Sequence, residues 1–146
     1  MARLFLDTSA LVKLYRAEPD SPAVRACIAP GDELVISPIT PLEFRSAFFG
    51  LSRQQIIELV QAEKIIDTFL NDLSQYTVIP ITHEVVNLAE SLLQNWGIWQ
   101  GLRPLDALQL ASAYEFHDSN PLDAIITTDR VLRTIAGAGH HVVLPE

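Results

Sequence analysis

Short apolar runs alternate with longer stripes of apolar residues along this chain, and the two patterns predict different elements. A short run bounded by polar or turn residues is typical of a strand that is covered on both faces. β-branched residues in such a run strengthen that interpretation. The sequence therefore predicts five strands, at residues 4–6, 34–37, 76–81, 124–128 and 142–144.

The stretches between these runs have apolar residues at helical spacing, and capping signals precede several of them. They predict seven helices, near residues 9–15, 22–29, 41–50, 56–73, 83–95, 104–114 and 130–136. Thr8 or Ser9 is the expected cap of the first helix, and Thr82 is that of the fifth. Residues 96–101, which include two tryptophans, are expected to form an irregular loop.

Two segments have the form of a capping box, in which a Ser or Thr caps the helix and an acid or amide three residues later returns a hydrogen bond. Thr40 and Glu43 make the first box, with Pro41 at the first helical position. Ser52 and Gln55 make the second. The helices that begin at these boxes are expected to form a hairpin.

Strands separated by helices predict parallel βαβ units with right-handed crossovers. The expected fold is α/β, a three-layer α/β/α sandwich with a five-stranded parallel sheet. A chain of 146 residues is long enough for one hydrophobic core, and no linker, repeat or low-complexity segment divides it. We expect a single domain over residues 1–146.

The charge balance limits what this fold can bind. Ten basic and eighteen acidic residues give a net charge of −8, which argues against nucleic-acid binding through a broad basic surface. A polyanionic substrate would need metal ions or local Arg and Lys side chains. The single cysteine, Cys27, excludes a disulfide within the chain, and no signal peptide follows Met1, so a cytoplasmic location is expected. No apolar run approaches the roughly 20 residues of a membrane span, and we expect no membrane segment.

Four acidic residues occupy comparable places relative to the predicted elements. Asp7 and Asp129 directly follow strands, whereas Glu43 and Asp106 lie in the first turn of helices. Each alone has a structural explanation as a helix cap or as a partner of the helix dipole. Together they would place like charges at one edge of the sheet, an arrangement that a bound cation stabilises. Mg²⁺ and Mn²⁺ prefer such oxygen ligands, and a pair of these ions is the basis of two-metal nuclease chemistry.

The motifs around these acids resemble those of the PIN domain family over essentially the whole chain. They are Leu-Asp-Thr-Ser-Ala-Leu at residues 6–11, Thr40-x-x-Glu43, Arg103-x-x-Asp106-Ala107 followed by Leu110-Ala111, and Thr128-Asp129-Arg130. The compact form is similar to the VapC-type toxins of toxin–antitoxin pairs. The resemblance implies an endoribonuclease that depends on Mg²⁺ or Mn²⁺, whose catalytic and metal-binding acids would be Asp7, Glu43, Asp106 and Asp129.

The same resemblance implies supporting residues and partners. Thr8, Ser9 and Thr128 match small hydroxyl residues next to the acids, where a side-chain oxygen can orient a carboxylate or a bound water. The implied partners are an RNA substrate, a second copy in a homodimer and a cognate antitoxin protein. The antitoxin's tail would cover the helices between residues 40 and 73.

Several basic residues lie near the acids in the sequence and are candidate contacts for RNA phosphates. These are Lys13, Arg16, Arg103 and Arg130. The alternative for each is an ion pair with a neighbouring acid of this −8 surface. The four histidines lack a paired metal-ligand spacing and are expected at the surface.

Other functions fit part of these observations. A PIN-like module without catalytic activity would bind a partner protein, but the presence of all four acids argues against it. A housekeeping nuclease and a DNA-directed nuclease stay open. A phosphatase of the haloacid dehalogenase type would need a second aspartate two residues after Asp7, where this chain has Ser9.

Overall fold

Strand β1 (Arg3–Leu6) is the centre of a parallel sheet in the computed structural model, which describes residues 1–145. Within those residues the strand order is β3-β2-β1-β4-β5, and every neighbouring pair is parallel. The other strands are β2 (Glu33–Ile36), β3 (Thr77–Val78), β4 (Ala124–Ile126) and β5 (Val143–Leu144). The predicted five-stranded parallel sheet is confirmed.

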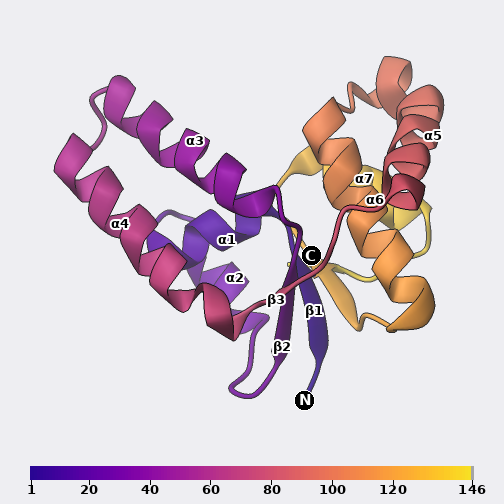
Figure 1. The fold of residues 1–146 in the computed structure, drawn as a ribbon, viewed down its shortest axis with the longest axis horizontal. Helices are drawn as coiled ribbons and strands as arrows, with labels where there is room; N and C mark the ends of the chain where they lie inside the picture. Colours follow the sequence, from indigo (N-terminus) through magenta and orange to yellow (C-terminus); the bar gives the residue numbers. More distant parts are fainter. Residues whose placement is uncertain (146) are drawn as a thin grey trace.

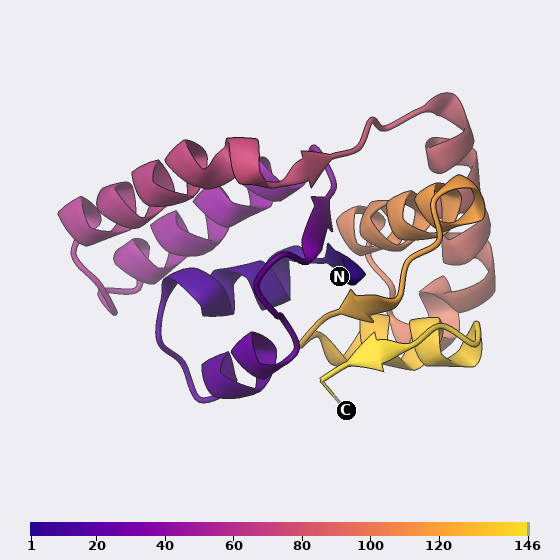
Figure 2. The same ribbon diagram turned by 90° about the horizontal axis from the view of Figure 1, so that it is seen from below.

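Helices cover both faces of this sheet. The side chains of β1 alternate between the two faces, and those of residues 4–6 are all buried, so both faces are covered. Leu4 and Leu6 pack with helices α1 (Thr8–Tyr15), α2 (Ser21–Ala26), α3 (Thr40–Arg53) and α4 (Leu59–Asp72). Phe5 packs with α5 (His83–Gln100), α6 (Pro104–Ser119) and α7 (Arg130–Ala138). Figures 1 and 2 show the two groups of helices on opposite sides of the sheet, which confirms the three-layer sandwich. None of the helices in residues 1–145 combines the length and the apolar composition that a membrane crossing requires.

An aromatic cluster joins α3 and α4 into the expected hairpin and packs it onto α1. The ring centroids of Phe44 and Phe69 lie 4.4 Å apart, and those of Phe44 and Phe48 lie 4.7 Å apart. Tyr15 meets both Phe44 and Phe69 edge to face. The three phenylalanines are fully buried, so this cluster forms the centre of one half of the core.

The second predicted capping box is wrong. Helix α3 continues through Gly50 to Arg53, so Ser52 lies inside its last turn. Gln55 has a φ of +61°, outside any helix. The capping box of α4 instead joins Glu58 and Gln61, and the Glu58 backbone N–H donates to Gln61 Oε1 at 2.9 Å. Capping-box motifs are common in polar segments between helices. The sequence alone therefore cannot show at which motif a helix begins, because that also depends on how the following helix packs.

The predicted loop over residues 96–101 is also wrong, because these residues complete α5. Gly97 is tolerated inside the helix, and the residue that ends it is Gly101, whose φ of +69° is the left-handed conformation that favours glycine. Trp96 packs against the core and adds to the stability of the last turns. Smaller differences are the earlier end of α2, at Ala26, and shorter third and fourth strands.

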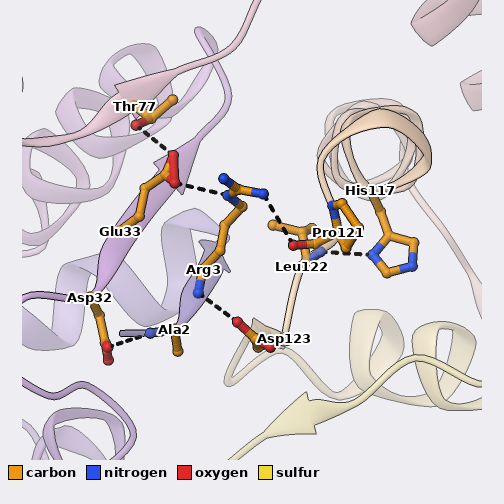
Figure 3. Close-up of polar contacts among 9 residues, drawn as sticks. All are labelled: Ala2, Arg3, Asp32, Glu33, Thr77, His117, Pro121, Leu122 and Asp123. Carbon is orange, nitrogen blue, oxygen red and sulfur yellow. Dashed lines mark hydrogen bonds and ion pairs between the residues drawn. The ribbon is translucent and has the colours of Figure 1, made fainter.

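Polar contacts connect the chain at the amino-terminal edge of the sheet, as Figure 3 shows. Arg3 Nε donates to Glu33 Oε1 at 2.8 Å, and Thr77 Oγ1 donates to Glu33 Oε2 at 3.2 Å. Asp32 and Asp123 accept from the backbone N–H groups of residues 2 and 3, each at 2.8 Å. These bonds join β1, β2 and β3 with the start of β4 at the edge opposite the candidate site.

The aromatic cluster yields a test of the core. Phe69→Ala should destabilise the protein by about 3–5 kcal/mol, because a fully buried ring is lost and a cavity remains. Val60→Ala in the same helix is the control, since Val60 is 55% exposed, and its effect should stay within about 0.5 kcal/mol. Urea unfolding at unchanged m-value measures both. Similar losses in the two variants would show that α4 packs differently.

Candidate active site

The candidate site lies where the order of strands reverses. From β1 the chain continues to β2 on one side, whereas β4 pairs with β1 on the other side. In open α/β sheets, ligands bind beyond the carboxyl ends of the strands at such a switch point. Asp7 directly follows β1, and Asp129 follows β4 after two threonines.

A cleft of about 530 Å³ opens at this point, within the usual size range of ligand pockets. Its walls include the four predicted acids, Asp7, Glu43, Asp106 and Asp129. Thr8, Ser9 and Arg103 also line it, with Leu42 and Leu105 as exposed apolar residues. The fold thus gathers in one cleft four acids that are separated by up to 122 positions in the sequence.

Asp7 is the most buried of the four acids, with 3% of its surface exposed. Its Oδ1 accepts from Ser9 Oγ at 2.7 Å and from the Ala10 backbone N–H at 3.1 Å. Its Oδ2 accepts from Thr127 Oγ1 at 2.8 Å. Asp7 itself is therefore the cap of α1, and the predicted cap at Thr8 or Ser9 is wrong. Ser9 lies inside the helix and orients the Asp7 carboxylate.

The environment of Asp7 raises its pKa from 3.8 to about 6. Burial is the main cause, because it removes water from the charged form, and the negative charge of Asp129 adds to it. The hydrogen bonds from Ser9, Thr127 and Ala10 lower the pKa and offset only part of the effect. The carboxylate thus destabilises the metal-free protein at neutral pH.

Glu43 is anchored by groups from two other helices. Its Oε1 accepts from Thr8 Oγ1 at 2.8 Å and from Gln109 Nε2 at 2.7 Å. The predicted capping box with Thr40 is wrong, because Ile39 is the cap residue of α3 and no side chain caps the helix. Thr40 is buried inside the first turn, where its hydroxyl accepts from Gln109 at 3.1 Å. Both residues of the expected box therefore face the site network.

Gln109 is a site residue that the sequence analysis missed. It is 2% exposed, and its Nε2 contacts Thr8, Thr40 and Glu43, so α6 on one face of the sheet is tied to α1 and α3 on the other. Its Oε1 is buried without a hydrogen-bond partner among the described residues. The sequence signal was a polar residue within an apolar stretch of α6, three positions after Asp106.

Asp106 and Asp129 complete the acidic lining of the cleft. Burial and the charge of Asp129 raise the pKa of Asp106, whereas Arg103 lowers it in part. Arg103 Nε lies 3.3 Å from Asp106 Oδ2. Asp129 Oδ1 accepts from the Leu132 backbone N–H at 2.9 Å and caps α7.

The Thr128 side chain makes no hydrogen bond with an acid among residues 1–145, and its supporting role stays a prediction. The hydroxyl that supports an acid belongs to Thr127, which is fully buried and bonds both Asp7 Oδ2 and the Asp129 backbone N–H. Thr128 uses its backbone N–H, which donates to Ser9 Oγ at 3.0 Å. The resemblance pointed to the hydroxyl directly before the last acid, whereas the hydroxyl that bonds Asp7 belongs to the residue before that one.

Of the predicted RNA contacts, Arg103 lines the cleft with a side chain that is 77% exposed. Arg130 lies in the first turn of α7 and is not part of the cleft wall. Lys13 and Arg16 both pair with Glu18, at 3.2 and 3.7 Å. His117 and His141 are half-buried, and His141 stacks on Tyr114, which contradicts the expectation that all histidines lie at the surface.

The donor atoms fit a hard divalent cation, because four carboxylates line the cleft, together with Gln109, whose buried Oε1 has no hydrogen-bond partner among the described residues. Asp7 accepts three hydrogen bonds, one fewer than a carboxylate has lone-pair sites. Among residues 1–145, no three His, Cys, Asp or Glu side chains converge on one ion-sized space as they stand. Like charges repel without a cation, so binding would require the carboxylates to turn toward one another.

Comparisons with known proteins identify the family that this chain matches. A model of the PIN domain matches residues 4–138. Ribonuclease VapC35 of Mycobacterium tuberculosis is 29% identical over 137 residues, which cover 92% of this chain and 90% of that protein. Two solved structures from the same organism are similar in fold. VapC20, described as a sarcin-ricin loop cleaving toxin, has a TM-score of 0.63 at 15% identity and covers 90% of this chain and 94% of its own. VapBC-5 has a TM-score of 0.64 at 18% identity and covers both chains fully.

The buried Asp7 predicts a stability gain on neutralisation. A raised folded-state pKa means that the stability from this group is complete below its ordinary value of 3.8 and is lost as the pH rises through about 6. The loss is on the order of 3 kcal/mol at pH 7. Asp7→Asn, which keeps a capping oxygen, should therefore be more stable than wild type by about 1–3 kcal/mol at pH 7 in EDTA.

The gain of Asp7→Asn should shrink toward zero as the pH falls well below 3.8, where Asp7 is protonated in both the folded and the unfolded state. Urea unfolding over this pH range measures it. Asp67→Asn, at an exposed position of α4, is the control and should show no such pH dependence. A constant difference between Asp7→Asn and wild type at all pH values would contradict the buried charge.

Proposed function

This chain belongs to the PIN domain family, and on that premise we propose that it is a Mg²⁺- or Mn²⁺-dependent endoribonuclease, the toxin of a toxin–antitoxin pair. The observation that supports this most is the convergence on one cleft of four carboxylates, which come from the ends of two strands and the first turns of two helices. A relative named as a ribonuclease, VapC35, supports RNA as the substrate.

The four acids would hold the metal ion. When bound, Mg²⁺ or Mn²⁺ supplies charge stabilisation at the phosphoryl group and activation of water. Ser9 and Thr127 orient Asp7, and Thr8 and Gln109 orient Glu43. Both of these hydrogen bonds are accepted by Glu43 Oε1, so Glu43 Oε2 would be available to a metal ion in the cleft.

The reaction would be hydrolysis of an RNA phosphodiester. The oxygen of a water molecule forms a bond to phosphorus, the bond from phosphorus to one ribose oxygen breaks, and that oxygen leaves with a proton. One product strand then ends in a phosphate and the other in a hydroxyl group. Arg103, exposed at the wall of the cleft, is placed to pair with a phosphate.

An antitoxin would bind the α3–α4 hairpin. This hairpin exposes Phe49, Ile56, Leu59 and Val60, each by 41% or more, which is an apolar surface that a partner segment can bury. A cationic side chain of the partner would enter the acidic cleft and take the place of the metal charge. A solved relative is described as a member of the VapBC family of toxin–antitoxin systems, which supports such a partner.

A homodimer and a cytoplasmic location remain parts of this proposal. Ile98 and Trp99, in the last turn of α5, are 89% and 82% exposed and offer apolar surface for a second copy. A single free cysteine, Cys27, suits a reducing compartment.

Activity tests the proposal directly. The purified protein should cleave single-stranded RNA with Mg²⁺ or Mn²⁺ and not in EDTA, and Asp7→Asn or Asp106→Asn should lower kcat by about 10²-fold or more. Asp67→Asn removes the same charge outside the cleft and should keep wild-type activity. Cleavage of single-stranded DNA at an equal rate would favour a DNA-directed nuclease. A folded Asp7→Asn variant with full activity would place the chemistry elsewhere.

Metal binding has a readout that does not depend on turnover. Mn²⁺ at about 100 times its dissociation constant should stabilise the wild type by roughly 2.7 kcal/mol, which is several degrees in Tm. Asp106→Asn should melt at or above wild type in EDTA, because it relieves repulsion with Asp129, and should gain much less from Mn²⁺. Equal metal-induced shifts in both proteins would exclude the cleft as the metal site, and a clear loss of stability in EDTA would make Asp106 a structural residue.

A further inference from the structure

A second hollow, of about 260 Å³, adjoins the acidic cleft. Thr8, Ser9 and Ala47 line both, so the two hollows are neighbours, and we describe them together as a groove between α1 and α3. The second hollow is bounded by Lys13 and Glu18. A strand that occupies the cleft can therefore continue along this groove.

Lys13 is the basic residue that lines the second hollow. It follows Ser9 by one helical turn, which places their Cβ atoms on the same face of α1, roughly 5–6 Å apart. Its side chain is only 18% exposed, and Nζ lies 3.2 Å from Glu18 Oε1. Arg16 Nη1 lies 3.7 Å from Glu18 Oε2. One carboxylate thus contacts two cations, and the three side chains together have a net charge of +1.

The Glu18 carboxylate is not needed to close the turn between α1 and α2. The Glu18 backbone N–H donates to Ser21 Oγ at 2.9 Å, and Ser21 Oγ donates to the Arg16 carbonyl at 3.1 Å. The Ser21 backbone N–H donates to the Glu18 carbonyl at 3.0 Å. Since backbone groups and the buried Ser21 hydroxyl hold this turn, the side chain of Glu18 is available for another role.

We propose that Lys13 binds a backbone phosphate of the RNA next to the phosphate that is cleaved, and that Glu18 occupies this phosphate's place in the free protein. A carboxylate and a phosphate are both oxyanions that accept charge-assisted hydrogen bonds from an ammonium group. Val12, Ala47 and Leu51 provide apolar walls beside a ribose. The proposal rests on the proposed function, because it requires RNA as the substrate.

Substitutions of Lys13 and of Glu18 should change KM in opposite directions. Lys13→Gln should raise KM for a short single-stranded RNA about five- to tenfold, with kcat changed by less than about twofold, because the contact is remote from the reacting atoms. The slope of log affinity against log salt concentration should fall by about 0.7, the value for one phosphate contact on a single strand. Glu18→Gln should lower KM about two- to fivefold, since it removes the competing carboxylate.

Two variants serve as controls. Lys13→Arg keeps the charge and should restore most of the affinity. Glu33→Gln removes an acid that pairs with Arg3 at the opposite edge of the sheet (Figure 3), so it makes the same change in net charge and frees a basic residue far from the groove. It should leave KM unchanged, which separates a local effect from a general one.

Binding by fluorescence anisotropy in the Asp106→Asn background gives the same comparison without cleavage. If wild type cleaves RNA but Lys13→Gln and Glu18→Gln leave KM, affinity and salt slope unchanged, the phosphate site is wrong and the proposed function stands. That result would also be expected if Lys13 served only a protein partner. If wild type neither binds nor cleaves RNA, the proposed function itself fails.

Discussion

The buried carboxylate of Asp7 at the end of the central strand is the constraint on which the site depends. The same side chain caps α1, accepts from Ser9 within that helix and accepts from Thr127 after β4. It therefore fixes the relative position of the two strands at the switch point. Its burial raises its pKa, so the fold keeps an ionisable group where a neutral hydrogen-bond acceptor would be more stable at neutral pH. Such a cost to stability is typical of functional sites.

A second connection, through Gln109, joins the two helical layers beside the cleft. The two helical layers are separated by the sheet over most of its area, and at its carboxyl edge the amide of α6 reaches Thr8, Thr40 and Glu43 from the opposite layer. The opposite edge is connected by Glu33, Arg3 and Asp123. Both edges are therefore bound by polar contacts.

The sequence was sufficient for features that depend on local patterns. Buried apolar runs and the alternation of strands and helices predicted the parallel sheet and its three layers, and the four acids were located because each follows a strand or opens a helix. What it could not show was the partner of each polar side chain. The capping box of Thr40 and Glu43 and the cap at Thr8 or Ser9 rested on the assumption of local bonds, and Thr128 rested on the match to a family motif.

Tertiary contacts replaced the expected ones at Glu43 and at Thr127, and another local contact did so at the start of α1. Glu43 bonds a helix from the other face of the sheet, Asp7 takes the cap position, and Thr127 reaches across from β4. Gln109 was missed because a single polar residue in a helix carries no periodic signal. The extra turns of α5 follow from the packing of Trp96, which propensity alone does not contain. Side-chain pairing at a functional edge is thus the part of the structure that sequence pattern specifies least.

Net charge finally explains how the basic residues near the cleft are arranged. In a protein of charge −8, Arg103 pairs with Asp106, and Lys13 and Arg16 pair with Glu18, so the cations that would attract RNA are partly neutralised in the free protein. Under the proposed function, a metal ion that takes over Asp106 would also free Arg103 to pair with a phosphate. Metal and RNA would then each favour the binding of the other, because both compete with the same internal ion pair. The acidic surface would thereby keep the affinity for RNA low until the metal is bound. The same few residues would then both bind the substrate and control when it binds.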